Sequence, residues 1–236
     1  MTSVLEFASV SKDYRSLRPL RIERFVVHAN ERVALVGLDA LMAEVFVNLA
    51  TGATLPDAGE VKVFGRPTSA IVESDEWLTT VDRFGIVSDR AVLLDSFSVL
   101  QNLSVPFTLE VEPPSEEVAG KAAGRAREVG LPESDWTKPV GSLDAAARVK
   151  VRLGRAIALD PSVVLLEHAS AGVEESDASA LAARLRDLGE RRGAAVIAVT
   201  VDRVFAAAVA DRMLVLDAAS GRLSEGRRGW FRWRRG

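Results

Sequence analysis

The chain has 236 residues, of which 48% are hydrophobic and 27% charged, and its net charge is −3. This composition is typical of a globular protein whose core supports one domain, alone or with an inserted lobe. Cysteine is absent and there are two histidines, His28 and His168, which excludes disulfides and thiolate zinc sites and nearly excludes metal catalysis through His or Cys. The slightly acidic balance gives no general attraction to nucleic acid.

The amino-terminal stretch MTSVLEFASVSKDY lacks the basic and then apolar pattern of a signal peptide. No apolar run approaches the roughly 18 residues that a membrane-spanning helix needs. We therefore expect the protein to stay in the cytoplasm.

Short segments rich in β-branched and aromatic residues predict strands in the first ninety positions. In chain order they are VLEFASV, IERFVVH, RVALVG, EVKVFG and, after a gap, FGIVS. From about residue 92 to 150 the pattern becomes helical. There, EPPSEEVAGKAAGRAREVGLPESDW carries Val118, Ala122, Ala126 and Val129 at helical spacing before a Gly-Leu-Pro stop.

Strands and helices then alternate to the end of the chain. The segments are a helix at about 144–159, the strand SVVLLE, a helix carrying Leu181, Leu185 and Leu188, the strand AAVIAVT, a short helix and the strand RMLVLD. Apolar strands separated by amphipathic helices predict a mostly parallel sheet covered on both faces. We expect an α/β core formed by residues 1–90 and 151–226, a helical lobe inserted at about 91–150, and a tail at 227–236.

The stretch VGLDALMAEVF, residues 36–46, follows the predicted strand RVALVG. A strand that ends in Val-Gly and runs into a helix is where nucleotide-binding proteins place their phosphate loop, which needs glycines, a lysine and a hydroxyl. Only the first glycine, Gly37, is present. The stretch is therefore either a phosphate loop that has lost its chemistry or a plain turn into a helix.

Ordered framework segments resemble the ATP-binding cassette family, the nucleotide-binding subunits of ABC transporters, from about residue 3 to 225. They are SKDYR with Tyr14, ATLPDAGEVKVFGRP, FSVLQNLSVPF, VRLGRAIALDPSVVLLE and VADRMLVLD. FSVLQNLSVPF is similar to the branch of small cassettes that serve lipoprotein-release and cell-division complexes. The resemblance implies a P-loop NTPase-like ABC ATPase fold, with a mostly parallel sheet core and an inserted helical subdomain.

The resemblance also implies where a nucleotide would lie, and other residue types stand at those positions. In the phosphate loop, Met42 replaces the second glycine, Ala43 the lysine and Glu44 the hydroxyl that holds magnesium. Asp39 and Glu44 add carboxylates beside a triphosphate, and each like-charge contact at about 4 Å costs on the order of 4 kcal/mol at an effective dielectric near 20. The other replacements are Asp89 at the Q-loop position, Asp144, Ala145 and Ala146 in the signature stretch, Glu167 at the magnesium aspartate, His168 at the catalytic glutamate and Val201 at the switch histidine.

Several of these residues also have a structural interpretation. Asp144 stands where a helix begins, and an aspartate there is typically an N-cap. His168 is a general base by its chemistry, but without a lysine or phosphate cradle it has no substrate in place. Tyr14 keeps the family's adenine-stacking identity, yet without a phosphate site we expect it to pack against the first strand or a partner.

From these replacements we predict a catalytically inactive pseudo-ATPase, without metal or cofactor, that is kept as a structural or regulatory binding subunit of a membrane complex. The alternative is the degenerate half of an asymmetric ATPase dimer that supports ATP-driven transport in trans. A third class, an active ATPase with unusual residues, is separated from both by a nucleotide-binding assay. The expected partners are an integral membrane subunit and a second cassette subunit, at the inner face of the cell membrane, and no nucleic acid.

Two further segments predict contacts with the membrane complex. In the family, the segment after the Q-loop lines a groove for the transmembrane subunit, and here it is apolar; the predicted groove residues are Leu93, Leu94, Phe97, Val99 and Leu100. The tail mixes aromatic residues with arginines, namely Arg227, Arg228, Trp230, Phe231, Arg232, Trp233, Arg234 and Arg235. This mixture favours anionic lipid headgroups over nucleic acid, with a solvated tail as the remaining alternative.

Overall fold

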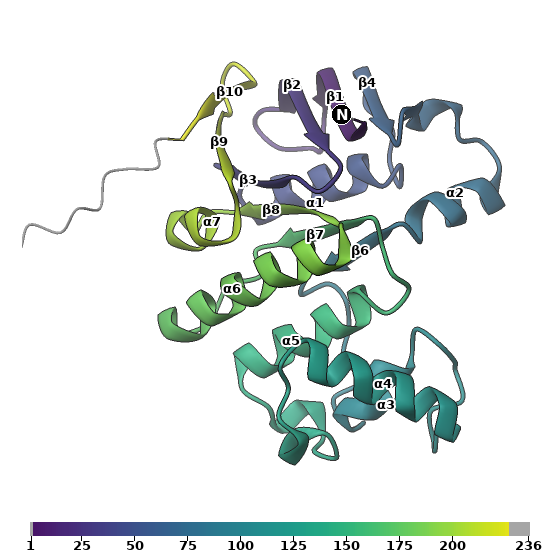
Figure 1. The fold of residues 1–236 in the computed structure, drawn as a ribbon. Helices are drawn as coiled ribbons and strands as arrows, with labels where there is room; N and C mark the ends of the chain where they lie inside the picture. Colours follow the sequence, from purple (N-terminus) through teal and green to yellow (C-terminus); the bar gives the residue numbers. More distant parts are fainter. Residues whose placement is uncertain (1, 227–236) are drawn as a thin grey trace, which may run out of the picture.

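The structure is a computed structural model that describes residues 2–226 (Figure 1). The strands are β1 (Ser3–Lys12), β2 (Leu20–His28), β3 (Arg32–Val36), β4 (Ala58–Val63), β5 (Arg66–Pro67), β6 (Phe84–Val87), β7 (Val163–Glu167), β8 (Ala195–Thr200), β9 (Arg212–Asp217) and β10 (Arg222–Glu225). The helices are α1 (Ala40–Ala50), α2 (Ser74–Val81), α3 (Val99–Ser104), α4 (Glu116–Glu128), α5 (Ala145–Ala156), α6 (Glu175–Arg192) and α7 (Arg203–Val209). None of these described helices is long and apolar enough to cross a membrane.

The strands form two sheets in the described part of the chain. The six-stranded sheet has the order β10-β9-β3-β8-β7-β6 and is parallel except for β10. It confirms the predicted mostly parallel core. The strands β2, β1, β4 and β5 form a separate antiparallel sheet, which the sequence pattern did not distinguish from the core sheet.

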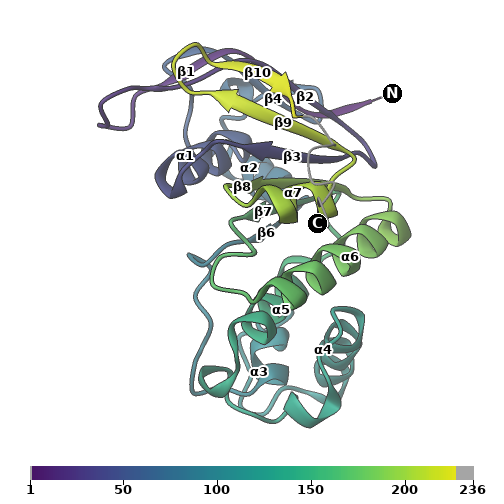
Figure 2. The same ribbon diagram turned by 90° about the vertical axis from the view of Figure 1, so that its left-hand side faces the viewer.

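Successive residues of the central strands supply the two faces of the parallel sheet. In β7, Val163 and Leu165 belong to one apolar cluster, and Val164 and Leu166 belong to the other. This is the alternation expected of strands buried on both sides. The first cluster continues through α1 into the antiparallel sheet, where Phe46 of that helix stacks on Phe7 of β1 at a ring-centroid distance of 5.0 Å. Helix α1 therefore lies between the two sheets (Figures 1 and 2).

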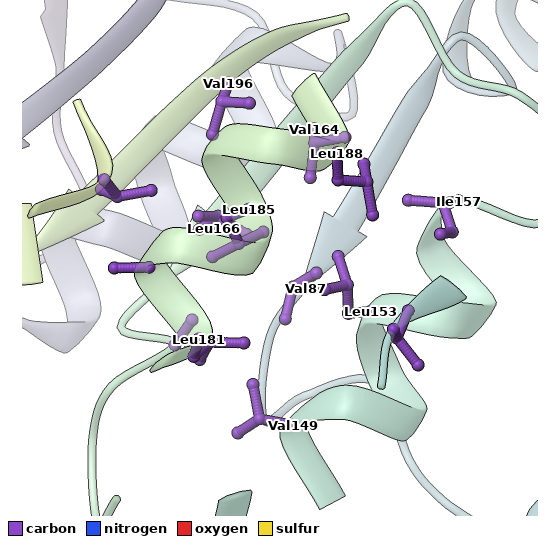
Figure 3. Close-up of a cluster of buried hydrophobic side chains, with 14 of the residues drawn as sticks. Val87, Val149, Leu153, Ile157, Val164, Leu166, Leu181, Leu185, Leu188 and Val196 are labelled. Carbon is purple, nitrogen blue, oxygen red and sulfur yellow. The ribbon is translucent and has the colours of Figure 1, made fainter. Parts of the chain in front are cut away.

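The second cluster joins the parallel sheet to the helices at the opposite end of the molecule. Helices α3, α4 and α5 lie at this end, away from the antiparallel sheet (Figure 2). In Figure 3, side chains of α5 and α6 converge with those of β6, β7 and β8. The labelled members are Val87, Val149, Leu153, Ile157, Val164, Leu166, Leu181, Leu185, Leu188 and Val196. The helical region thus shares an apolar cluster with the core, and the exact division at residues 91 and 150 stays a prediction.

Candidate functional site

Most of the predicted nucleotide positions meet at one edge of the parallel sheet. Strands β3, β8, β7 and β6 are parallel neighbours, so their carboxyl ends lie at the same edge. Ligands of open α/β sheets bind outside this edge. Gly37, Val201, Glu167 and Asp89 each lie at or just beyond the end of one of these strands.

The turn from β3 into α1 is built from Gly37 and Asp39. Gly37 has φ +104°, and a Cβ atom there would lie 2.9 Å from the carbonyl oxygen of Leu216, so the position requires glycine. The Asp39 carboxylate accepts a hydrogen bond of 2.8 Å from the backbone N–H of Met42 and caps α1. Met42 and Ala43 are buried in the cluster between the sheets. The Asp39 carboxylate therefore already binds one of the backbone N–H groups at the N-terminus of α1.

A salt-bridge cluster lies beside this turn and is formed by Arg90, Glu167 and Glu44. The Arg90 Nη2 group is 2.7 Å from Glu167 Oε2, and its Nε is 3.2 Å from Glu167 Oε1. Arg90 Nη1 also donates to Glu44 Oε1 at 3.3 Å. The Glu167 side chain is only 8% exposed. Hydrogen bonding to Glu167 raises the pKa of Arg90 above its ordinary value, so the guanidinium stays charged.

His168 directly follows Glu167 and Val201 directly follows β8, but neither side chain takes part in the salt-bridge cluster. His168 has φ +47°, its backbone N–H donates to the carbonyl of Val199, and its buried Nε2 has no hydrogen-bond partner among residues 2–226. Val201 is 62% exposed. Tyr14 is half-buried and packs against the cluster that includes the first strand, as the packing interpretation predicts.

Asp89 and Asp144 contact the helical region instead. The Asp89 carboxylate is 2.8 Å from Nη1 of Arg152, on α5. Asp144 caps α5 by accepting a hydrogen bond of 2.7 Å from the backbone N–H of Ala147, which confirms the N-cap interpretation. The structure therefore brings Gly37, Glu44 and Glu167 to one edge, and places Asp144 at the start of a lobe helix.

The resemblance implies a magnesium ion at this edge, and the side chains present do not fit one. Glu167, at the magnesium-coordinating position, already has both carboxylate oxygens paired with Arg90. A guanidinium in that place repels a divalent cation. Within residues 2–226 there is also no cluster of three or more His, Cys, Asp or Glu residues suited to a metal ion.

The predicted groove residues divide into core and surface. Leu93 and Val99 are buried in the core cluster, so these two do not line a partner groove as predicted. Leu100 is partly buried against the same cluster, and its place in the groove stays a prediction. Leu94 and Phe97 do line a hollow of about 520 Å³, together with Val105 and residues 108–113. The residues predicted for lipid contact, 227–236, lie outside the described residues.

Arg90 is the main site residue that the sequence analysis missed. It stands next to Asp89 in FGIVSDR, and it is 77 positions away from Glu167. The signal was indirect, because two carboxylates predicted at one sheet edge need a counter-charge. The sequence alone does not say which arginine supplies that counter-charge.

Comparison with solved structures defines the class of protein. The cassette cbiO1 from Clostridium perfringens, part of an ABC transporter complex, superposes with a TM-score of 0.80 at 19% identity and covers 96% of this chain and 89% of its own. A dimeric ATP-binding cassette in a post-hydrolysis state, bound to ADP and phosphate, gives a TM-score of 0.76 at 21% identity over 96% of this chain and 100% of its own. These matches show the ABC ATPase fold.

Sequence relatives then show the family. The lipoprotein-releasing system ATP-binding protein LolD of Chromohalobacter salexigens is 33% identical over 203 residues, which cover 84% of this chain and 82% of the relative. The methionine import ATP-binding protein MetN of Mesorhizobium japonicum is 27% identical over 84% of this chain and 53% of its own length. No protein-family model matches the chain. The chain belongs to the family of ABC transporter nucleotide-binding subunits.

These relatives overturn the predicted function. The prediction of a pseudo-ATPase that is not an enzyme is wrong, because the sequence relatives are ATP-binding proteins of transport systems. Nothing in the structure shows that activity has been lost. The error came from taking non-consensus side chains at single positions as sufficient to exclude activity.

Proposed function

We propose that this chain is one of the two cassettes of an asymmetric ABC transporter ATPase dimer and supports ATP-driven transport in trans. The observation that carries the proposal is the 33% identity with a lipoprotein-releasing ATP-binding protein across 84% of the chain. Identity of this extent spans both the sheet core and the helical region. In this proposal, the non-consensus residues Ala43 and Asp144 belong to one half of a composite site, and the other half comes from a partner cassette.

The segment between β6 and α3 supports a role in coupling. At one end Arg90 binds Glu167 and Glu44 at the sheet edge, and at the other end Leu94 and Phe97 line the apolar hollow. The two ends are a few residues apart in sequence. A change at the sheet edge is therefore transmitted along a short, well-anchored backbone to the surface where we propose that a membrane subunit docks.

The partners follow from this assignment. We propose an integral membrane subunit on the hollow beside Leu94 and a second cassette across the sheet edge, at the inner face of the cell membrane. The tail at 227–236 is proposed to add contacts with anionic lipid. An apolar surface that accepts a partner segment is typical of helix-in-groove recognition.

The test is purification of the native complex through a tag on this chain, identification of the co-purifying proteins and reconstitution in liposomes. We expect an integral membrane protein and a second cassette in the complex. ATP turnover should fall at least about tenfold when the complex is rebuilt without this chain, which corresponds to about 1.4 kcal/mol of transition-state stabilisation.

A matched control uses the partner cassette. Replacing the lysine of its phosphate loop should abolish turnover while this chain stays bound. Equal ATP turnover with and without this chain, or purification without any membrane protein, would contradict the proposal.

A further inference from the structure

Arg90 joins three separate elements at the carboxyl edge of the parallel sheet. It belongs to the segment after β6, its Nε and Nη2 groups contact the carboxylate of Glu167 at the end of β7, and its Nη1 group contacts Glu44 in α1. The shortest of these contacts is 2.7 Å. One side chain thus lies between two carboxylates that come from different parts of the fold.

The contact with Glu167 has the geometry of a strong ion pair. Two nitrogens of the planar guanidinium face the two carboxylate oxygens, which is the bidentate arrangement that arginine favours. Glu167 is nearly buried, and a buried carboxylate without a partner is strongly destabilising. Arg90 therefore supplies the counter-charge that stabilises the Glu167 carboxylate in the fold.

The backbone around Arg90 is fixed independently of this contact. The Arg90 N–H donates to Ser88 Oγ at 3.1 Å, and the next residue, Ala91, has its carbonyl oxygen bound by Arg152 Nε at 3.4 Å. Arg155, also on α5, donates to the carbonyl of Val92 at 2.8 Å. The segment is held on both sides of Arg90, so the backbone from which the guanidinium extends is fixed in place.

We propose that Arg90 is the resident cation of this edge, and that its guanidinium occupies the place between Glu44 and Glu167 where a divalent cation would otherwise bind. The wild-type chain therefore has no divalent-cation site at these carboxylates. Removing the guanidinium leaves two carboxylates, from α1 and β7, converging on one vacated position. Carboxylate oxygens are preferred ligands of Mg²⁺ and Mn²⁺, so the variant gains a metal site that the natural chain lacks.

The test compares wild type, Arg90→Ala and Arg90→Gln as isolated chains without nucleotide, by Mn²⁺ electron paramagnetic resonance and by thermal unfolding with and without Mn²⁺. We expect no Mn²⁺ effect on wild type. In both variants we expect saturable Mn²⁺ binding, and a Tm increase of about 3–6 °C when Mn²⁺ is at roughly ten times its Kd. The neutral glutamine of Arg90→Gln retains polar contacts, so this variant replaces Arg90→Ala in the test if the alanine variant folds poorly.

Three controls separate a metal site from general destabilisation. Adding Glu167→Gln to Arg90→Gln should remove Mn²⁺ binding, and Arg90→Lys, which keeps a cation, should not gain it. Arg152→Ala removes a neighbouring guanidinium from the exposed Asp89 and should gain none. Mn²⁺ binding by wild type that depends on Glu167, or a folded Arg90→Gln chain that binds no Mn²⁺, would overturn the proposal. Neither result depends on whether the chain takes part in transport.

Discussion

Asp39 controls how the chain leaves β3 and enters α1. Its carboxylate accepts a hydrogen bond from the N–H of Met42, and its backbone carbonyl accepts one from Ala43. The side chain thus satisfies one of the backbone donors that a helix N-terminus leaves without an intrahelical partner, and the bond from Ala43 is the first regular bond of the helix. The side-chain half of this arrangement is lost on substitution by alanine, whereas the backbone half remains.

We expect Asp39→Ala to lower the free energy of unfolding by about 1 kcal/mol, because the side-chain cap disappears. Asp39→Ser keeps a capping oxygen and should lose far less. Urea unfolding followed by circular dichroism measures both variants. Equal losses in the two variants would show that the negative charge, and not the cap, is what stabilises the turn.

Some residue-scale features of the site were predictable and others were not. The cap formed by Asp144 is local, since donor and acceptor are three positions apart, and the sequence alone predicts it. The pair formed by Arg90 and Glu167 depends on which strands become neighbours in the sheet. A local pattern carries no information on such a partner, and for this reason the sequence analysis found the carboxylate without its cation.

Helices α4 and α6 are joined by an ion pair between the lobe and the core. Arg192 donates from Nε to Glu128 Oε1 and from Nη2 to Oε2, each at 2.7 Å, and both side chains are less than one-fifth exposed. Hydrogen bonding from Arg192, together with its charge, holds the pKa of Glu128 below its ordinary value although burial opposes this shift. The folded protein therefore favours the ionised carboxylate.

We expect Glu128→Gln to lower the free energy of unfolding at neutral pH by about 1.5–3 kcal/mol, the range for a hydrogen bond to a charged group. Because the folded-state pKa is lowered, this stabilisation is fully present above the ordinary pKa of the carboxyl and is lost as pH falls through the lowered value. The difference between wild type and variant should therefore shrink in acid. Urea titrations at a series of pH values measure it.

Glu117→Gln is the matched control, because Glu117 pairs with Lys121 on the exposed face of the same helix. We expect no measurable loss of stability from that change. A difference between wild type and Glu128→Gln that stays constant into acid would contradict the assigned role of the ionised carboxylate.

The hollow beside α3 gives a second prediction for the lobe. Leu94 is 40% exposed and lines the hollow, so Leu94→Glu should leave the protein folded. Recovery of the membrane subunit should fall at least tenfold, because the complex would bury a charge that has no partner. Co-purification from membranes measures the loss.

Leu17→Glu makes the same change at a fully exposed leucine outside the hollow and should retain the partner. Leu93→Glu places the charge in the core and should unfold the chain. Full recovery of the membrane subunit with Leu94→Glu would exclude the hollow as the docking surface.

Element prediction succeeded where burial leaves a pattern. The leucines of α6 at positions 181, 185 and 188 are buried, and their spacing predicted the helix. Helix α2 has no buried residue, so it leaves no apolar stripe and was not predicted. The antiparallel sheet was hidden for a different reason: β1, β2 and β4 were recognised as strands, but their composition does not say which strands pair.

At the scale of the whole molecule, charge is distributed unevenly along the chain. The net charge is −3, yet residues 227–235 contain five arginines and three aromatic residues. We expect the full-length protein to sediment with anionic liposomes and a chain lacking 227–236 to do so at least tenfold less, since each basic residue adds about 1 kcal/mol near anionic lipid. High salt should weaken this binding without abolishing it, because screening removes only the electrostatic part.

Replacing Trp230, Phe231 and Trp233 by alanine separates the aromatic contribution to membrane binding from the electrostatic contribution of the arginines. This variant keeps its arginines, so its binding should be fully lost in high salt. Equal sedimentation of full-length and shortened chains would show that the tail does not hold the protein at the membrane.

The order of strands in the parallel sheet also determines when this protein can fold during its synthesis. Strand β3 lies between β8 and β9, which begin at residues 195 and 212, and it forms its ladder with no earlier segment. At synthesis rates of about 5–20 residues per second, β3 waits roughly 10–30 s for its neighbours. During that time the hydrophobic run Val33–Val36 is an unpaired strand, which is a template for aggregation. We therefore expect the nascent chain to need protection from aggregation until β8 and β9 have emerged.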